Sequence, residues 1–440
     1  MRHILVTGVR QSKAPIEVRE KFALTEPEVT NAIDWMMAQP GVEECVVLTT
    51  CNRTEIYLAG CDAATCLKTV KRFFRDVKGV DVDRYRRAMF TLMGEDTSLH
   101  LFRVASGLDS LILGEAQILG QVKEALAAAQ QKHSAGARLD KLFKTALTVG
   151  KRVRTETGIA VKDVSVSRAA YQLMRRESPD LLEKRIALLG GGKMASILLA
   201  SLKRDMTSEQ LARVMVVNRS EKRLAELVEK FGITQTKTWA DIDNVLADAD
   251  VLFVATGAPH LVLEHQDFVN AGPCLVMDIS VPRNVDPAVE NLDHVRLYNT
   301  DDLKALGASC DENVQVLTDH AREIIEEEFA GYCQWLISRP VAPTIAQLRS
   351  KIEQIATLHA ASNLPVKESN GSMPDTEAFV RSLVNKILHD PTMRLKTTQN
   401  LEEIYRQAAT LSHLFNIETP MPWKNVPQPV VLRKKHQTGT

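Results

Sequence analysis

The spacing of apolar residues changes along the chain, and each change predicts a domain boundary. Up to about residue 160, short apolar runs alternate with stretches of helical spacing, which predicts an α+β domain over residues 1–160. The expected strands are 4–6, 45–48 and 56–58, and the expected helices are 28–38, 118–129 and 139–153. We expect the first strand to stop at Gly8, because glycine interrupts regular structure.

Residues 161–300 alternate strictly between strand and helix patterns. The expected helices are 167–174, 194–202 and 221–231, and the expected strands are 186–189, 214–217, 251–255 and 275–279. Such alternation implies right-handed crossovers and a parallel sheet that is covered on both faces. The second domain is therefore predicted to have a doubly wound α/β fold.

The last part of the chain is predicted to be helical. Thr300 and the acidic residues after it favour a helix start, and the segment 303–338 contains no proline. Its roughly thirty-five residues would form a helix about 50 Å long, which needs another surface to lie against. Two more helices are expected at 345–361 and 376–388, split by a polar linker at 362–375. The three amphipathic helices have no core of their own and predict an oligomerisation module.

These patterns give a multidomain α/β chain with a spinal helix at 301–338, a helical module at 339–420 and a disordered tail at 421–440. The 440 residues are 45% apolar and 25% charged, which fits a folded chain with no membrane span. Its 55 basic and 55 acidic residues balance, so a polyanion must be met by local patches. Seven cysteines are a poor disulfide framework, so we expect reduced thiols and a cytoplasmic protein. We expect no metal, since Cys61 and Cys66 have no matching pair downstream.

A glycine turn after the strand at 186–189 predicts a dinucleotide site. Gly190, Gly191, Gly192, Lys193, Met194 and Ala195 form the pattern G-x-G-x-x-A between a strand and a helix. The glycines permit a tight turn and a close approach of a pyrophosphate to the helix N-terminus. The alternative is an ordinary tight turn.

The next strand favours NADPH over NADH. It ends in Asn218, Arg219 and Ser220, where an NAD site would place a carboxylate, and a guanidinium with a hydroxyl accepts a 2′-phosphate. A solvated helix start is the alternative reading of these three residues. Thr256 and Gly257 follow another strand and are expected at the same carboxyl edge of the sheet, near the nicotinamide ribose.

Two further segments carry candidate chemistry. Cys51 stands in a polar run two residues before Arg53, where a thiolate is stabilised, although most single cysteines are small buried hydrophobes. His100 lies in an apolar helical segment and is either a core residue or a catalyst. The block 106–118 places polar side chains among apolar ones, so they either bond one another or face a ligand.

The combination of motifs resembles the glutamyl-tRNA reductases, NADPH-dependent enzymes of the five-carbon route to tetrapyrroles such as haem. The motifs occur in one order across almost the whole chain. They are residues 14–20, 50–55, 106–123, the glycine turn, 218–220, 278–287 and 389–392.

The resemblance implies a V-shaped homodimer with three domains along a spinal helix: a catalytic domain, a Rossmann-like NADPH domain and a dimerisation domain. It implies reduction of the glutamate ester on tRNA(Glu) to glutamate-1-semialdehyde with release of tRNA. Cys51 is then the nucleophile that forms a thioester, and His100 assists it by activating the thiol or by orienting the ester. Arg53 would bind the γ-carboxylate of glutamate bidentately. The remaining substrate-binding residues are expected to be Thr50, Ser110, Glu115, Gln117 and Gln121, with Glu115 as an alternative partner of the substrate ammonium.

One departure is Gln11, which stands in a segment where the family usually has a histidine. The basic clusters 68–75, 84–87 and 151–154 are candidates for tRNA backbone contacts, although charge runs are usually solvated faces. The family also implies a transient complex with glutamate-1-semialdehyde aminomutase. An NADP-dependent oxidoreductase with a small-molecule substrate and a non-catalytic tRNA-binding scaffold remain as alternatives.

Overall fold

The computed structural model describes residues 3–110, 113–115, 117–159, 165–303, 312–363, 376–398 and 400–417. The chain divides into two compact units, residues 2–326 and 327–440, and each is described by itself. The predicted linker from residue 364 onward, the predicted tail and the predicted start of the spinal helix lie outside the described residues. Within the described ranges, no helix is both long and apolar enough to cross a membrane.

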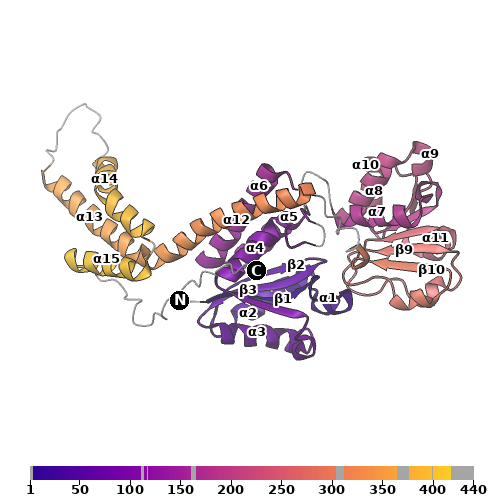
Figure 1. The fold of residues 1–440 in the computed structure, drawn as a ribbon, viewed down its shortest axis with the longest axis horizontal. Coiled ribbons are helices and arrows are strands. Elements are labelled where there is room, and N and C mark those ends of the chain that lie inside the picture. Colours follow the sequence, from indigo (N-terminus) through magenta and orange to yellow (C-terminus); the bar gives the residue numbers. More distant parts are fainter. Residues whose placement is uncertain are drawn as a thin grey trace, which may run out of the picture. The chain divides into compact units, whose positions relative to one another are not determined.

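The first domain is a four-stranded antiparallel sheet between two layers of helices, as Figure 1 shows. Its strands are β1 (His3–Arg10), β2 (Val42–Thr49), β3 (Arg53–Gly60) and β4 (Met89–Met93), in the order β2-β3-β1-β4. The helices are α1 (Ile16–Phe22), α2 (Glu26–Met37), α3 (Ala63–Asp76), α4 (Glu95–Ala105), α5 (Ile118–Gln131) and α6 (Ala137–Thr157). Helices α2 and α3 pack on one face of the sheet, and α4 to α6 pack on the other. The predicted α+β pattern is confirmed.

Strand β1 does not stop at Gly8, so that prediction was wrong. The strand continues to Arg10 and pairs with β3 along its whole length. A Cβ atom at Gly8 would lie 2.0 Å from the carbonyl oxygen of Thr54. The glycine therefore allows the two strands to approach each other and does not end the first one.

The second domain is a six-stranded, fully parallel sheet, and the predicted Rossmann-like topology is confirmed. Its strands are β5 (Ile186–Leu189), β6 (Met215–Val217), β7 (Gln235–Lys237), β8 (Val251–Val254), β9 (Cys274–Asp278) and β10 (Val295–Asn299). The order β10-β9-β8-β5-β6-β7 reverses direction beside β5, where such sheets bind dinucleotides. The covering helices are α7 (Val166–Glu177), α8 (Lys193–Asp205), α9 (Ser208–Leu211), α10 (Glu221–Phe231) and α11 (Ile242–Asp248). Strands β7 and β10 were not predicted.

The helical part comprises α12 (Glu312–Ser338), α13 (Ala342–Asn363), α14 (Thr376–Thr397) and α15 (Leu401–Leu414). Helix α14 was predicted to end at Leu388 but runs through Pro391, and α15 was not predicted. The prediction that these helices lack a core was also wrong. Two small apolar clusters hold them together, one around Ile404 and one around Val384.

Candidate active site

The hairpin between β2 and β3 presents Cys51 at its tip. The turn closes through a hydrogen bond of 2.8 Å from the Thr50 N–H to the Arg53 carbonyl oxygen, and the Thr50 hydroxyl accepts from the Asn52 N–H at 3.1 Å. Cys51 is half-buried and packs against the apolar core on one face of the parallel sheet. The side-chain oxygen of the adjacent residue Asn52 is buried and has no hydrogen-bond partner among the described residues. The tip thus brings the thiol of Cys51 to the second domain.

Alternate residues of β3 build an ionic network on one face of that strand. Arg53, only 2% exposed, donates to Oε1 of Glu55 at 2.7 Å. The Tyr57 hydroxyl donates to the other oxygen of Glu55, also at 2.7 Å. Burial alone would raise the pKa of Glu55, but the charges of His100 and Arg53 hold that pKa well below its usual range. Glu55 is therefore a buried carboxylate ion with complete partners.

Asp109 binds the same arginine from the loop that follows α4. Its carboxylate accepts from Arg53 at 3.0 Å and from Arg10 at 3.2 Å, and its carbonyl oxygen also accepts from Arg53. Asp109 is 26% exposed, so it forms the solvent side of the network. The arginine expected to bind a substrate carboxylate is occupied by two internal carboxylates in this structure.

His100 is fixed by the same network. Its Nε2 atom lies 2.9 Å from Oε1 of Glu55, and its Nδ1 atom lies 3.9 Å from Asp109. The ring packs edge-on against Phe90, with centroids 5.2 Å apart. Among the described residues, no hydrogen bond joins His100 to Cys51. The geometry thus favours an orienting role for His100 over direct activation of the thiol.

The Cys51 thiol is protonated at neutral pH in this environment. Burial and the charge of Glu115 raise the pKa of Cys51 to about 12, although Arg19 and Arg53 lower it. The arginine effect expected from the sequence exists, but burial and a carboxylate outweigh it. Glu115 is itself 5% exposed, and burial raises its pKa despite the charges of Arg53 and Arg154. Chemistry at Cys51 therefore needs a change of environment.

The other predicted substrate residues lie in the loop and helix that follow Asp109. Arg154 of α6 donates to the backbone carbonyl of Glu115 at 3.3 Å. The Nε2 atom of Gln117 is buried, and no residue in the described part of the chain accepts a hydrogen bond from it. Ser110 and Gln121 are partly exposed, and neither has a side-chain hydrogen bond within the described part of the chain. These placements leave the predicted substrate contacts as predictions.

The glycine turn of the second domain fits a bound diphosphate. Gly190 has a φ of 121°, and a Cβ atom there would lie 2.2 Å from the carbonyl oxygen of Ala255. Gly192 stands at the N-terminus of α8, and a Cβ atom there would meet nothing within 4 Å. The turn therefore needs glycine for backbone shape and leaves open space in front of the helix amides. Lys193, Met194 and Ala195 form the first turn of α8, and Ala195 is fully buried.

The predicted 2′-phosphate residues lie at the carboxyl end of β6. Asn218 lies directly against the glycine turn: a Cβ atom at Gly191 would lie 2.8 Å from the Nδ2 atom of Asn218 and would collide with it. Arg219 lies over the ring of Trp239 at 5.6 Å, and the Ser220 hydroxyl caps α10 by accepting from the Arg223 N–H. An NAD site would require a carboxylate at this strand end, and none of these three residues carries one.

The predicted ribose residues are held by the motif at 278–287. The Thr256 hydroxyl bonds to the side-chain oxygen of Asn284, whose amide donates to the carbonyl oxygens of Ala258 and His260. A Cβ atom at Gly257 would meet nothing within 4 Å. The loop after β8 is thus rigidly supported and open on one side.

One group of residues in the site also has the geometry of a metal centre. Glu55, His100 and Asp109 place ligand atoms close enough to hold a metal ion, but Arg53 bonds to both carboxylates and already supplies the positive charge.

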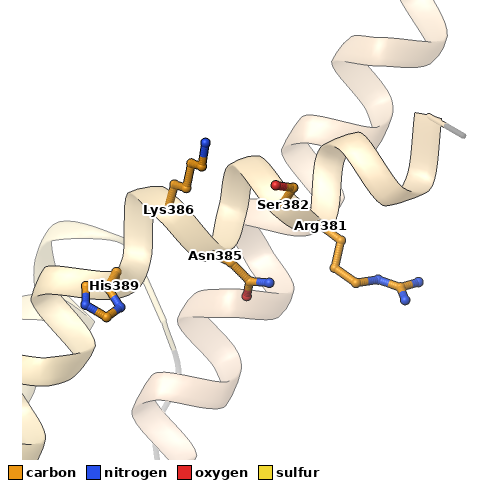
Figure 2. A pocket seen from close by; sticks show the side chains of 5 residues that line it. All are labelled: Arg381, Ser382, Asn385, Lys386 and His389. Atoms are coloured by element: carbon orange, nitrogen blue, oxygen red, sulfur yellow. The ribbon is translucent and has the colours of Figure 1, made fainter. Parts of the chain in front are cut away.

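Two surface hollows lie away from this site. A hollow of about 480 Å³ on α14 is lined by polar and basic side chains (Figure 2), and a second of about 470 Å³ lies between α10 and β7. The residues around the first are Arg381, Ser382, Asn385, Lys386 and His389. Neither hollow contains a predicted site residue.

Sequence reasoning missed Asn52 beside the thiol and four residues of the network, which are Glu55, Tyr57, Asp109 and Arg10. The alternation Arg53, Glu55, Tyr57 is a period-2 signal that places three polar side chains on one face of a strand. No local signal links Asp109 or Arg10 to them, since those contacts span 56 and 99 positions.

Comparison with known proteins identifies all three parts of the chain. Residues 7–157 match the family model "Glutamyl-tRNAGlu reductase, N-terminal domain", and residues 172–306 match "Shikimate / quinate 5-dehydrogenase". Residues 320–417 match "Glutamyl-tRNAGlu reductase, dimerisation domain".

Full-length relatives agree with these matches. The glutamyl-tRNA reductase of Picosynechococcus sp. is 38% identical over 424 residues, covering 95% of this chain and 99% of the relative. The glutamyl-tRNA reductase of Synechococcus sp. is 36% identical over 429 residues, and the match covers 96% of this chain and 98% of the relative. The solved glutamyl-tRNA reductase from Methanopyrus kandleri is 26% identical, with a TM-score of 0.43, and the match covers 95% of this chain and 100% of that one.

Proposed function

The chain belongs to the glutamyl-tRNA reductase family, and we propose that it reduces the glutamyl ester of tRNA to glutamate-1-semialdehyde through a thioester on Cys51. The observation that carries the thioester route is the position of Cys51. It lies at the tip of a hairpin and packs against the core of the dinucleotide domain. A nucleophile held there meets substrate from one domain and reductant from the other.

The proposed chemistry uses two steps at one sulfur atom. The thiolate of Cys51 attacks the ester carbonyl, a C–S bond forms, and the C–O bond to the tRNA ribose breaks as its hydroxyl takes up a proton. NADPH, when bound, supplies the hydride that reduces the thioester to the aldehyde. Cys51 then leaves as a thiolate and is ready for the next ester.

Substrate itself is proposed to activate the thiol. In the free protein, the charge of Glu115 helps to keep Cys51 protonated. If Glu115 pairs with the α-ammonium of the substrate, that charge is compensated and the pKa of Cys51 falls. The thiol would then become reactive only when glutamyl-tRNA is bound, which protects it from oxidation and from other electrophiles.

Arg53 is proposed to bind the γ-carboxylate of the glutamyl group. Glu55 holds one side of the guanidinium in a buried pair, so it fixes the direction of Arg53. Asp109 is the more exposed of the two carboxylates that bind Arg53. A substrate carboxylate would therefore replace Asp109 or bind beside it. Thr50, Ser110, Gln117 and Gln121 are proposed to complete the pocket, with His100 orienting the ester from its place on Glu55.

NADPH is the proposed cofactor rather than NADH. The open glycine turn in front of α8 suits a diphosphate, and Arg219 with Ser220 suits a 2′-phosphate. Asn218 borders the turn at Gly191 and would contact the adenosine ribose.

The proposed assembly is a homodimer formed through the C-terminal helices, supported by the match to a dimerisation domain. The proposed partners are tRNA(Glu) and, transiently, the aminomutase that consumes the semialdehyde. Helix α3 carries an exposed row of basic residues, although Lys71 and Arg75 are partly neutralised by aspartates. A cytoplasmic location is proposed because a catalytic thiol requires a reducing compartment.

The test of the thioester route is a pair of cysteine variants. Cys51→Ser should abolish semialdehyde formation, and wild-type protein given glutamyl-tRNA without NADPH should carry an acyl adduct on Cys51 by mass spectrometry. Cys61→Ser, a change at an exposed thiol in the same domain, should keep full turnover. Full turnover by the Cys51 variant would exclude the thioester.

A further inference from the structure

Two motifs of the sequence have only minor parts in the site described so far: Arg19 of one lowers the pKa of Cys51, and Asn284 of the other supports Thr256. These are the segments 14–20 and 278–287, which lie 258 or more positions apart. Helix α1 carries most of the first motif, and the second forms the loop after β9. The structure brings the two segments into direct contact through ion pairs.

The first ion pair joins Arg283 of the second domain to Glu20 of α1. The Nε and Nη2 atoms of Arg283 donate to the two oxygens of Glu20 at 3.0 and 2.8 Å, which is a bidentate arrangement. Its Nη1 atom also donates to Glu17 at 3.3 Å. Arg283 is 14% exposed, so solvent screens this pair only in part.

A second ion pair binds the other side of α1. Arg19, 2% exposed, donates to Asp301 at 2.7 Å and to the Thr300 hydroxyl at 3.1 Å. The backbone N–H of Ile16 donates to the other oxygen of Asp301 at 2.9 Å. Thr300 and Asp301 directly follow β10, as the Arg283 loop follows β9.

Both anchor points therefore lie beyond the carboxyl ends of neighbouring parallel strands. That edge of the sheet is where dinucleotides bind in this topology. The ion pairs place α1 of the catalytic domain at this edge, and Cys51 of the same domain packs against the core of the second domain. Contacts that fix α1 on this edge also fix the distance from Cys51 to the bound cofactor.

We propose that α1 is an interdomain clasp, formed by the pairs Arg283–Glu20 and Arg19–Asp301, which holds the dinucleotide domain at the distance from Cys51 that hydride transfer needs. The clasp residues are positioning residues and contact neither the substrate nor the cofactor. The inference rests on the proposed thioester route, because it assigns the clasp to the second step of that route alone.

The mechanism predicts that weakening the clasp separates the two steps. The bonds formed and broken in thioester formation belong only to Cys51 and glutamyl-tRNA, so this step does not need the cofactor at hydride-transfer distance. Hydride transfer needs both domains within contact distance, and a small misplacement of reacting groups lowers a rate by about 10²-fold. If these contacts only stabilised the fold, breaking them would instead lower the rates of both steps in parallel.

The experiment uses charge reversal in the full-length protein. The variants are Arg283→Glu, Glu20→Arg and the double variant with both changes. For each, acyl transfer to Cys51 is measured without NADPH, NADPH affinity is measured by fluorescence titration, and semialdehyde formation is measured with both substrates. Arg213→Glu, an exposed arginine at the amino end of β6, is the matched control.

The single reversals should keep acyl transfer and NADPH affinity within about twofold and lower semialdehyde formation by about tenfold or more. The double variant should recover most of that loss, because the pair is restored with its charges exchanged. Hydrogen exchange at the α1 amides should rise in the single variants and fall again in the double variant.

Three results would overturn the clasp: unchanged semialdehyde formation in both single variants, a parallel fall in acyl transfer, or a double variant no better than the single ones. Failure of the proposed function gives a different result. Wild-type protein would then carry no acyl group on Cys51, whatever the state of the Arg283–Glu20 pair.

Discussion

Glu55 is the residue whose removal should most destabilise the catalytic domain. Three donors converge on its buried carboxylate, from Arg53 and Tyr57 at 2.7 Å and from His100 at 2.9 Å. In Glu55→Gln the amide keeps one acceptor oxygen and presents an N–H group to donors. Arg53 then loses one of its two counter-charges, and His100 loses its carboxylate acceptor.

The expected cost follows from that geometry. Removing one partner of a buried ion pair costs about 3–5 kcal/mol, and we expect about 3 kcal/mol here because Asp109 remains bound to Arg53. Asp34→Asn is the matched control, since Asp34 makes an exposed surface pair with Lys132 in the same domain. That variant should cost about 0–1 kcal/mol.

The measurement is hydrogen exchange of the amides of β1 and β3, which reports the free energy of opening this sheet within a multidomain chain. A loss of about 3 kcal/mol accelerates exchange by about 10²-fold. The pKa of Glu55 is lower in the folded protein than in the unfolded chain, so its contribution is complete above about pH 4.3. The contribution is lost as the pH falls below that value. Equal exchange in the Glu55 and Asp34 variants at pH 7 would refute the argument.

Four further outcomes are expected. In the protein without substrate, Glu115→Gln should shift the pH profile of Cys51 alkylation downward, because the variant lacks the carboxylate that raises the pKa of the thiol; an unchanged or upward-shifted profile would contradict this. Gly192→Ala should fold with an unchanged melting temperature but bind NADPH about tenfold more weakly by fluorescence titration, since its methyl group fills the space before the helix amides. Arg219→Ala should raise the dissociation constant for NADPH by about ten- to hundredfold and leave that for NADH nearly unchanged. Leu383→Asp should give monomers in sedimentation, because it places a charge on an exposed apolar row of α14.

The parallel sheet was the most predictable part of the fold. Its central strands are buried on both faces, so they appear in the sequence as short continuous apolar runs, and 186–189 was predicted to the residue. Strand β7 gave no such signal because all three of its residues are exposed at the edge of the sheet. The same reason applies in part to β10 at the other edge, where Val295 is buried and the other four positions are exposed or partly exposed.

The candidate site was predictable only where its residues are neighbours in sequence. The hairpin tip with Cys51 and the glycine turn are local motifs, and both were found. The ionic partners of Arg53 and the contacts of α1 with Arg283 were not found, because a charged residue in a sequence does not reveal which distant residue pairs with it. Burial also reversed a local inference, since the arginines near Cys51 do not lower its pKa overall.

Helix α14 shows why the C-terminal helices were predicted to lack a core. Val380, Val384 and Leu388 form one row at a spacing of four residues, and this row is buried within the helical unit. A second row at the same spacing, one position earlier, is 65%, 42% and 54% exposed; its members are Phe379, Leu383 and Ile387. The helical unit covers only one of the two apolar rows, so the other row stays exposed to solvent. An exposed apolar row of this kind is typical of an interface with another protein. The first row makes the small core that sequence reasoning missed, and the second supports the proposed dimer interface.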